Sequence, residues 1–135
     1  MEHYKNLNLY QRAYKLAIDL HLYLNGEGKA ILSGNQEEMR RYSREIISYI
    51  AEQANQRTLR QKRFFAFKGL DSTYHLVSKI EYLVASNLFN SGEADHLLEG
   101  YSQVRNMLFK LSNSVGVSDF GEPKINYRTK KGFRI

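Results

Sequence analysis

The segment from 57 to 69, RTLRQKRFFAFKG, has the residue types that bind polyanions. It carries five basic side chains and three phenylalanines but no acidic residue. The basic residues are Arg57, Arg60, Lys62, Arg63 and Lys68. A charge-balanced helix often places glutamate four residues before lysine, and this segment contains no such partner. Because five like charges repel one another, we expect the segment to bind the phosphates of a nucleic acid.

The same residues also admit a purely structural interpretation. Phe64 and Phe67 would belong to the core, while the cations would form an ordinary solvated face. Under either interpretation we expect the phenylalanines to point inward and the cations to point outward. The two interpretations differ in whether carboxylates of the folded protein neutralise these cations.

Two further groups of basic residues could extend the cationic surface. The tail KINYRTKKGFRI contains no acid and contributes Lys124, Arg128, Lys130, Lys131 and Arg134. Its Tyr127–Arg128 and Phe133–Arg134 pairs place rings that can stack on unpaired bases beside groups that bind phosphate. The alternative is a tail that only keeps the chain soluble. The helix before the segment contributes Arg40, Arg41 and Arg44, if its face adjoins the segment.

The placement of the charge is more informative than its sum. The chain has 135 residues, with 20 basic against 14 acidic side chains and a net charge of +6. Outside the two segments 57–69 and 124–135, 10 basic residues remain against the same 14 acidic ones. Such a concentrated positive field attracts nucleic acid, an anionic lipid surface or an acidic protein.

Patterns typical of enzymes and metal proteins are weak or missing. Glu93 and His96 have the Glu-x-x-His spacing of di-iron bundles, but such a site needs a second pair, and no other histidine follows a glutamate at that distance. The loop GEGKA lacks the spacing of a phosphate loop. Cysteine is absent, which excludes thiol chemistry and disulfides. We therefore expect a non-enzymatic protein with no metal and no cofactor.

The N-terminus and the hydropathy pattern bear on where the protein works. The first residues lack a cationic start followed by an apolar run, which is the pattern of a secretory signal. No apolar stretch has the length needed to cross a bilayer. We therefore expect a cytoplasmic protein with no membrane partner, although a basic helix could also lie on anionic lipid.

Four helical segments must position these side chains. Hydrophobic residues recur at steps of three and four over 7–25, 37–55, 58–90 and 91–116, with glycines or polar residues between them. We expect Ser91 to cap the last helix and Gly116 to end it. The sequence thus predicts an all-α, antiparallel up-down four-helix bundle over residues 1–117, followed by a basic C-terminal tail over 118–135.

Each helix has one apolar stripe that we expect to face the core. In the first helix the stripe is Leu9, Ala13, Leu16, Leu20 and Leu24. In the second it is Met39, Tyr42, Ile46, Tyr49, Ile50 and Ala54. In the third it is Phe67, Leu70, Tyr74, Val77, Val84 and Leu88, with help from Ile80 and Leu83. In the fourth it is Leu97, Tyr101, Val104, Leu108, Leu111 and Val115.

Three stretches carry a resemblance to a known family. They are LYQRA at 9–13, YIAEQANQR at 49–57 and KGLDST at 68–73. With their helical context they resemble the 23S ribosomal RNA intervening-sequence protein family. That family is similar to the accessory variability proteins of diversity-generating retroelements. The chain departs from the family pattern at Tyr49, Gln53, Leu70 and Thr73, which leaves the branch open.

The resemblance implies a fold and a role. It implies a non-enzymatic four-helix bundle that assembles into a homopentameric ring. Members from retroelements bind nucleic acid and a reverse transcriptase, which needs them for cDNA synthesis. We therefore expect RNA or an RNA–DNA hybrid as ligand and a reverse transcriptase as partner. The alternatives are an orphan bundle encoded within a ribosomal RNA gene, or a protein-interaction module with a basic face.

Overall fold

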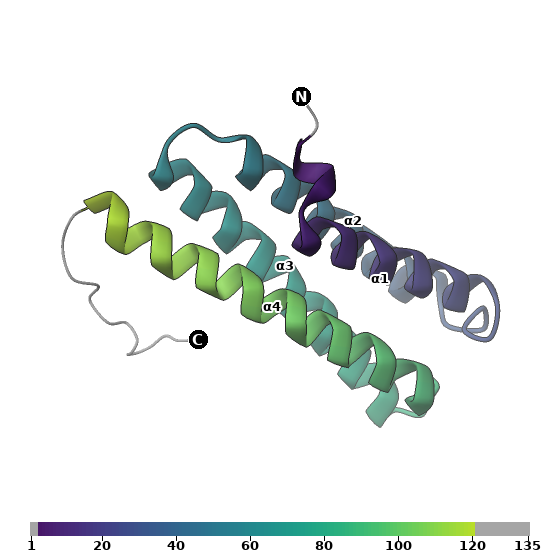
Figure 1. Ribbon diagram of the computed structural model, residues 1–135. Helices are drawn as coiled ribbons and strands as arrows, with labels where there is room; N and C mark the ends of the chain where they lie inside the picture. The colour runs from purple at the N-terminus through teal and green to yellow at the C-terminus, as the bar shows by residue number, and fades with distance from the viewer. Residues whose placement is uncertain (1–2, 121–135) are drawn as a thin grey trace.

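The computed structural model describes residues 3–120, which form four long helices after a short 3-10 helix (Figure 1). The elements are η1 (His3–Asn6), α1 (Asn8–Asn25), α2 (Ser33–Asn55), α3 (Leu59–Ala85) and α4 (Ser91–Phe120). Each helix packs against its two neighbours around the bundle, so that α1 contacts α2 and α4, and α3 contacts the same two. Residues 3–120 contain no strand. The predicted all-α four-helix bundle is confirmed.

The core follows the predicted stripes in α1, α2 and most of α4. All five residues of the α1 stripe are buried, and so are Met39, Ile46 and Ile50 of α2. In α4 the buried residues include Leu97, Tyr101, Val104 and Leu108. The side chain of Val115 lies outside the part of the chain whose side chains are described. Leucine and isoleucine at steps of three and four therefore identified these faces correctly.

The core face of α3 differs from the prediction. Its buried residues are Ala66, Gly69, Ser72, Thr73, Leu76, Ile80 and Leu83. The predicted stripe was wrong for Phe67, Tyr74 and Leu88, which are exposed. The true stripe is offset by one position, or about 100° around the helix.

Small residues explain why α3 turns this face inward. A Cβ atom on Gly69 would lie 3.3 Å from Leu108 Cδ1 and 3.5 Å from Tyr49 Cβ, so α2 and α4 both approach closely here. The Thr73 hydroxyl donates a 2.8 Å hydrogen bond to the Gly69 carbonyl, which satisfies its polar group within the core. Ser72 donates to Glu45 of α2 at 3.1 Å. Side chains as large as phenylalanine would not fit on this face of α3, because α2 and α4 approach it closely.

The helix ends correct several predicted boundaries. Thr58 caps α3, since its hydroxyl accepts a 3.1 Å hydrogen bond from the Gln61 amide. Asn90 rather than Ser91 caps α4, because its side chain accepts from the Glu93 amide at 2.9 Å. α2 begins at Ser33 instead of 37, and α3 ends at Ala85 instead of 90. α4 continues through the predicted stop at 116 to Phe120.

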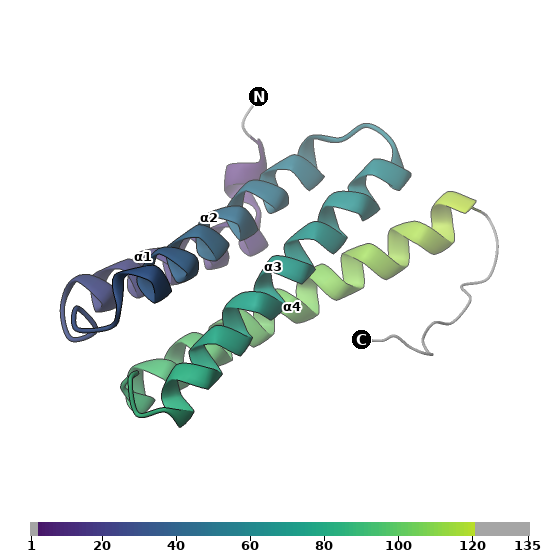
Figure 2. The same ribbon diagram turned by 180° about the vertical axis from the view of Figure 1, so that it is seen from behind.

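The helices differ in length, which shapes one end of the bundle. α1 has 18 residues, whereas α3 has 27 and α4 has 30. Figure 2 shows the start of α3 and the end of α4 extending past the beginning of α1, beside the α2–α3 connection. The cationic segment 57–69 lies at this end of the bundle.

Candidate nucleic-acid interface

The phenylalanines of the cationic segment point outward, contrary to our expectation. Phe64 is 54% exposed and Phe67 is 43% exposed, whereas Ala66 is fully buried. The cause is the orientation of α3, in which small residues occupy the core face. Two aromatic rings therefore lie at the protein surface among the cations.

Cationic side chains lie beside these rings. The Lys68 Nζ atom lies 5.9 Å from the centroid of the Phe64 ring and 5.9 Å from that of Tyr49. The guanidinium carbon of Arg63 lies 5.6 Å from the centroid of Phe67. Arg57, Arg60 and Lys68 are exposed, and Arg63 is half-buried. We call the surface formed by Arg57, Arg60, Arg63, Phe64, Phe67 and Lys68 the α3 surface.

Carboxylates do not neutralise every cation of the segment. Within residues 4–113, Arg57, Lys62 and Lys68 form no ion pair with an acidic side chain. Arg57 and Lys68 are also exposed, so their charges face solvent. These two cations are available to a negatively charged ligand.

Lys62 has a structural task instead. Its Nζ atom donates to the main-chain carbonyls of Gln53 at 3.4 Å and Ala54 at 3.3 Å, at the end of α2. These carbonyls belong to the last turn of a helix, where a cation also opposes the negative end of the helix dipole. Lys62 therefore fastens the start of α3 to the end of α2 and is turned away from the α3 surface.

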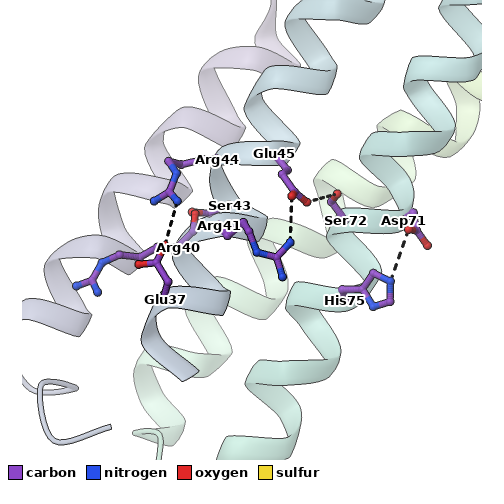
Figure 3. Close-up of polar contacts among 9 residues, drawn as sticks. All are labelled: Glu37, Arg40, Arg41, Ser43, Arg44, Glu45, Asp71, Ser72 and His75. Carbon is purple, nitrogen blue, oxygen red and sulfur yellow. Dashed lines mark hydrogen bonds and ion pairs between the residues drawn. The ribbon is translucent and has the colours of Figure 1, made fainter. Parts of the chain in front are cut away.

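The arginines of α2 do not extend the α3 surface. Figure 3 shows Arg41 directed at Glu45, 3.1 Å away, and Arg44 directed at Glu37, 3.3 Å away. The hydrogen bond to Glu45 raises the pKa of the Arg41 guanidinium. Both arginines are thus neutralised by carboxylates of their own helix.

Arg40 turns toward α1 instead of toward α3. Its guanidinium donates to Gln36 at 3.1 Å and to Asn25 at 2.8 Å, and it also contacts His21. Arg40 therefore ties α2 to α1 through neutral partners. The structure does not join the α2 arginines and the cationic segment into one patch.

An acidic residue marks one limit of the α3 surface. Asp71 follows Lys68 by one turn, is exposed, and lies 3.5 Å from His75 Nε2 on the same helix (Figure 3). Beyond it, His75 stacks on Tyr42 of α2 at 5.4 Å between ring centroids. Arg57 and Lys68 therefore lie before this acidic residue, on the first part of α3 and the connection that precedes it.

An apolar groove adjoins the α3 surface between α3 and α4. It has a volume of about 680 Å³ and is lined by Phe67, Leu70, Asp71, Tyr74, Arg105, Asn106 and Phe109. Tyr74 is 61% exposed and Phe109 is 46% exposed. The sequence prediction assigned Tyr74 to the core as part of the α3 stripe, and it assigned Phe109 to no stripe.

The remaining predicted features lie elsewhere. His96 Nε2 lies 2.9 Å from Asp19 Oδ2 of α1, and Glu93 stands in the first turn of α4. Residues 3–120 hold no cluster of three acidic or histidine side chains suited to a metal ion. The basic tail residues Lys124, Arg128, Lys130, Lys131 and Arg134 lie outside the described residues.

Two further findings bear on the identity of the chain. In the part of the chain that the structure describes, none of the helices combines the length and the apolar character of a membrane span. Comparison of the chain with protein-family models, curated proteins and solved structures found no match. Support for a function therefore comes from the geometry of the α3 surface and from the motif resemblance.

Proposed function

We propose that this protein is a non-enzymatic, cytoplasmic nucleic-acid-binding protein that holds RNA or an RNA–DNA hybrid on the α3 surface. The observation that carries the proposal is the pair of exposed cations, Arg57 and Lys68, that no carboxylate of residues 4–113 neutralises. A phosphate backbone would neutralise them and release its own counterions, which favours binding.

The number of cations sets the expected salt dependence. If Arg57 and Lys68 each neutralise one phosphate, they contribute a slope of about −1.4 to log K against log salt for a single strand. Lys62 is left out because it binds main-chain carbonyls. Binding of a labelled RNA oligonucleotide, measured at several salt concentrations, tests the proposal. A slope near zero would contradict it.

The role of accessory protein rests on the resemblance. In the family that the motifs resemble, bundles form rings of five and serve a reverse transcriptase. We propose the same assembly and partner here, because a ring would present several α3 surfaces to one strand and raise affinity by avidity. Light scattering of the purified chain tests the pentamer. Co-purification with a reverse transcriptase encoded nearby tests the partner.

A protein-interaction module is the second candidate, and the apolar groove between α3 and α4 favours it. Grooves of this kind accept helices or loops of partner proteins. This candidate predicts that an acidic protein partner binds equally well in the presence of excess RNA. If RNA displaces the partner, the two ligands share the α3 surface.

A further inference from the structure

Two exposed rings on the α3 surface distinguish it from a simple cationic patch. Resting on the proposed function, we infer that this surface selects single-stranded nucleic acid over a duplex. Unpaired bases stack on Phe64 and Phe67, while the phosphates contact Arg57 and Lys68. Aromatic side chains beside cations are the combination by which proteins bind single strands without reading their sequence.

The spacing of Phe64 and Phe67 on α3 allows one nucleic-acid strand to contact both rings. Residues three apart on a helix have Cβ atoms roughly 5–6 Å apart, so Phe64 and Phe67 lie side by side on the outer face. The Phe65 ring lies edge-on to Phe64, with centroids 5.1 Å apart, and Phe65 is itself stacked at 6.3 Å on Tyr49 of α2. Phe64 is therefore supported from within the bundle and is not a loosely held side chain.

Charge complementarity selects the occupant. Arg63 lies over Phe67 and Lys68 lies near Phe64, so each ring has a cation close to it. A polyanion that also carries exposed flat groups, as a strand of unpaired bases does, matches both the cations and the rings. An acidic protein surface or an anionic membrane supplies the charge but no flat ring at this spacing.

A duplex cannot use the rings in the same way. Its bases are paired and stacked on each other, and their faces are closed to a ring that projects from a helix. Duplex binding would therefore depend on the cations alone. Alanine substitution of a stacking ring weakens single-strand binding by about 5- to 150-fold. Because each ring here is only half exposed, we expect about 5- to 10-fold for each.

The test separates the contribution of the two rings to binding from the contribution of the cations, and it uses the full chain. The double variant Phe64→Leu/Phe67→Leu removes both rings but keeps apolar side chains of similar size. Tyr82→Leu is the matched control, since Tyr82 is 65% exposed on the same helix and lies about 22 Å from Phe67 along the axis. Affinity is measured by fluorescence anisotropy for a mixed-sequence 20-nucleotide RNA strand, the corresponding duplex and an abasic strand with the same number of phosphates.

We expect the double variant to lose roughly 25- to 100-fold in affinity for the RNA strand and less than about 2-fold for the duplex and the abasic strand. Tyr82→Leu should change none of the three. The wild-type protein should prefer the RNA strand to the abasic strand by the factor that the variant loses, which tests stacking without any substitution.

Several results would overturn the inference. Equal losses on all three ligands, or no loss on any, would show that the rings do not stack on bases. A change in the mass of the assembly on substitution would show that the rings contact a second copy. If the wild-type protein binds the strand and the duplex equally, the inference fails but the proposed function stands. If it binds neither, both fail.

Discussion

Two pairs of basic residues allow the charge-led mechanism to be tested with variants of equal net charge. Arg57→Gln/Lys68→Gln removes two exposed cations that no carboxylate of residues 4–113 neutralises. Arg41→Gln/Arg44→Gln also removes two cations, but these are bound to Glu45 at 3.1 Å and to Glu37 at 3.3 Å. Both variants lower the charge of the chain by the same amount, so their long-range fields change equally. They differ in whether the lost cations are already paired with a carboxylate.

The magnitude follows from counterion release. Each phosphate of a single strand that a cation neutralises contributes about 0.7 to the slope of log K against log salt. Losing Arg57 and Lys68 should therefore make the slope about 1.4 less steep. Between 50 and 200 mM salt, the wild-type protein should lose about seven times more affinity than this variant. The α2 variant should keep the slope of the wild-type protein.

Anisotropy titrations of a labelled RNA strand at four or five salt concentrations give both slopes. Cations of the tail contribute equally to all three proteins, so the difference between slopes isolates the described residues. Circular dichroism checks that each variant remains helical. If both variants reduce the slope by the same amount, net charge and not contact governs binding, and the assignment of the α3 surface is refuted.

Three further predictions concern stability and use urea unfolding. Lys62→Gln should cost about 0.3–1 kcal/mol, because it removes the cation at the end of α2, and should leave the salt slope unchanged. Leu76→Ala should lower the free energy of unfolding by about 2–5 kcal/mol, and Tyr74→Ala should lower it by less than about 0.5 kcal/mol. A larger loss for Tyr74→Ala would show that the aromatic stripe of α3 faces the core. Burial raises the pKa of Tyr101, so the unfolded chain ionises first and stability should fall as the pH rises above about 10. Tyr101→Phe should abolish this component, and persistence of the full pH dependence would contradict it.

The fold could be predicted from the sequence because three of its helices have one dominant apolar stripe. Leu9 to Leu24 in α1 and Leu97 to Leu108 in α4 form unbroken buried stripes at steps of three and four, although α1 also exposes Tyr14, Ile18 and Leu22 on another face. α3 has two candidate stripes. Its aromatic stripe has the larger hydrophobic surface, but Gly69, Thr73, Leu76, Ile80 and Leu83 follow steps of four and three without a break. The small residues face the core because they allow α2, α3 and α4 to pack closely. Close packing between helices cannot be deduced from the hydropathy of the sequence.

The candidate site was predicted less well than the fold. Clustered charge is a property of composition, but its neutralisation depends on which side chains the fold directs at each cation. The Arg41–Glu45 pair has i, i+4 spacing and could have been recognised. Lys62 binds carbonyls eight and nine residues earlier, which requires the α2–α3 turn to be known.

The orientation of α3 links folding to function through two costs. It leaves two phenylalanine rings partly in water, although burying such a ring would stabilise the bundle by about 1.5–3 kcal/mol. It also gathers like charges around those rings, where they repel one another. A duplex would relieve the repulsion but leave the rings in water, and an apolar partner would cover the rings but desolvate the cations. A single strand would relieve both costs at once, because its phosphates would meet the cations while its bases would cover the rings.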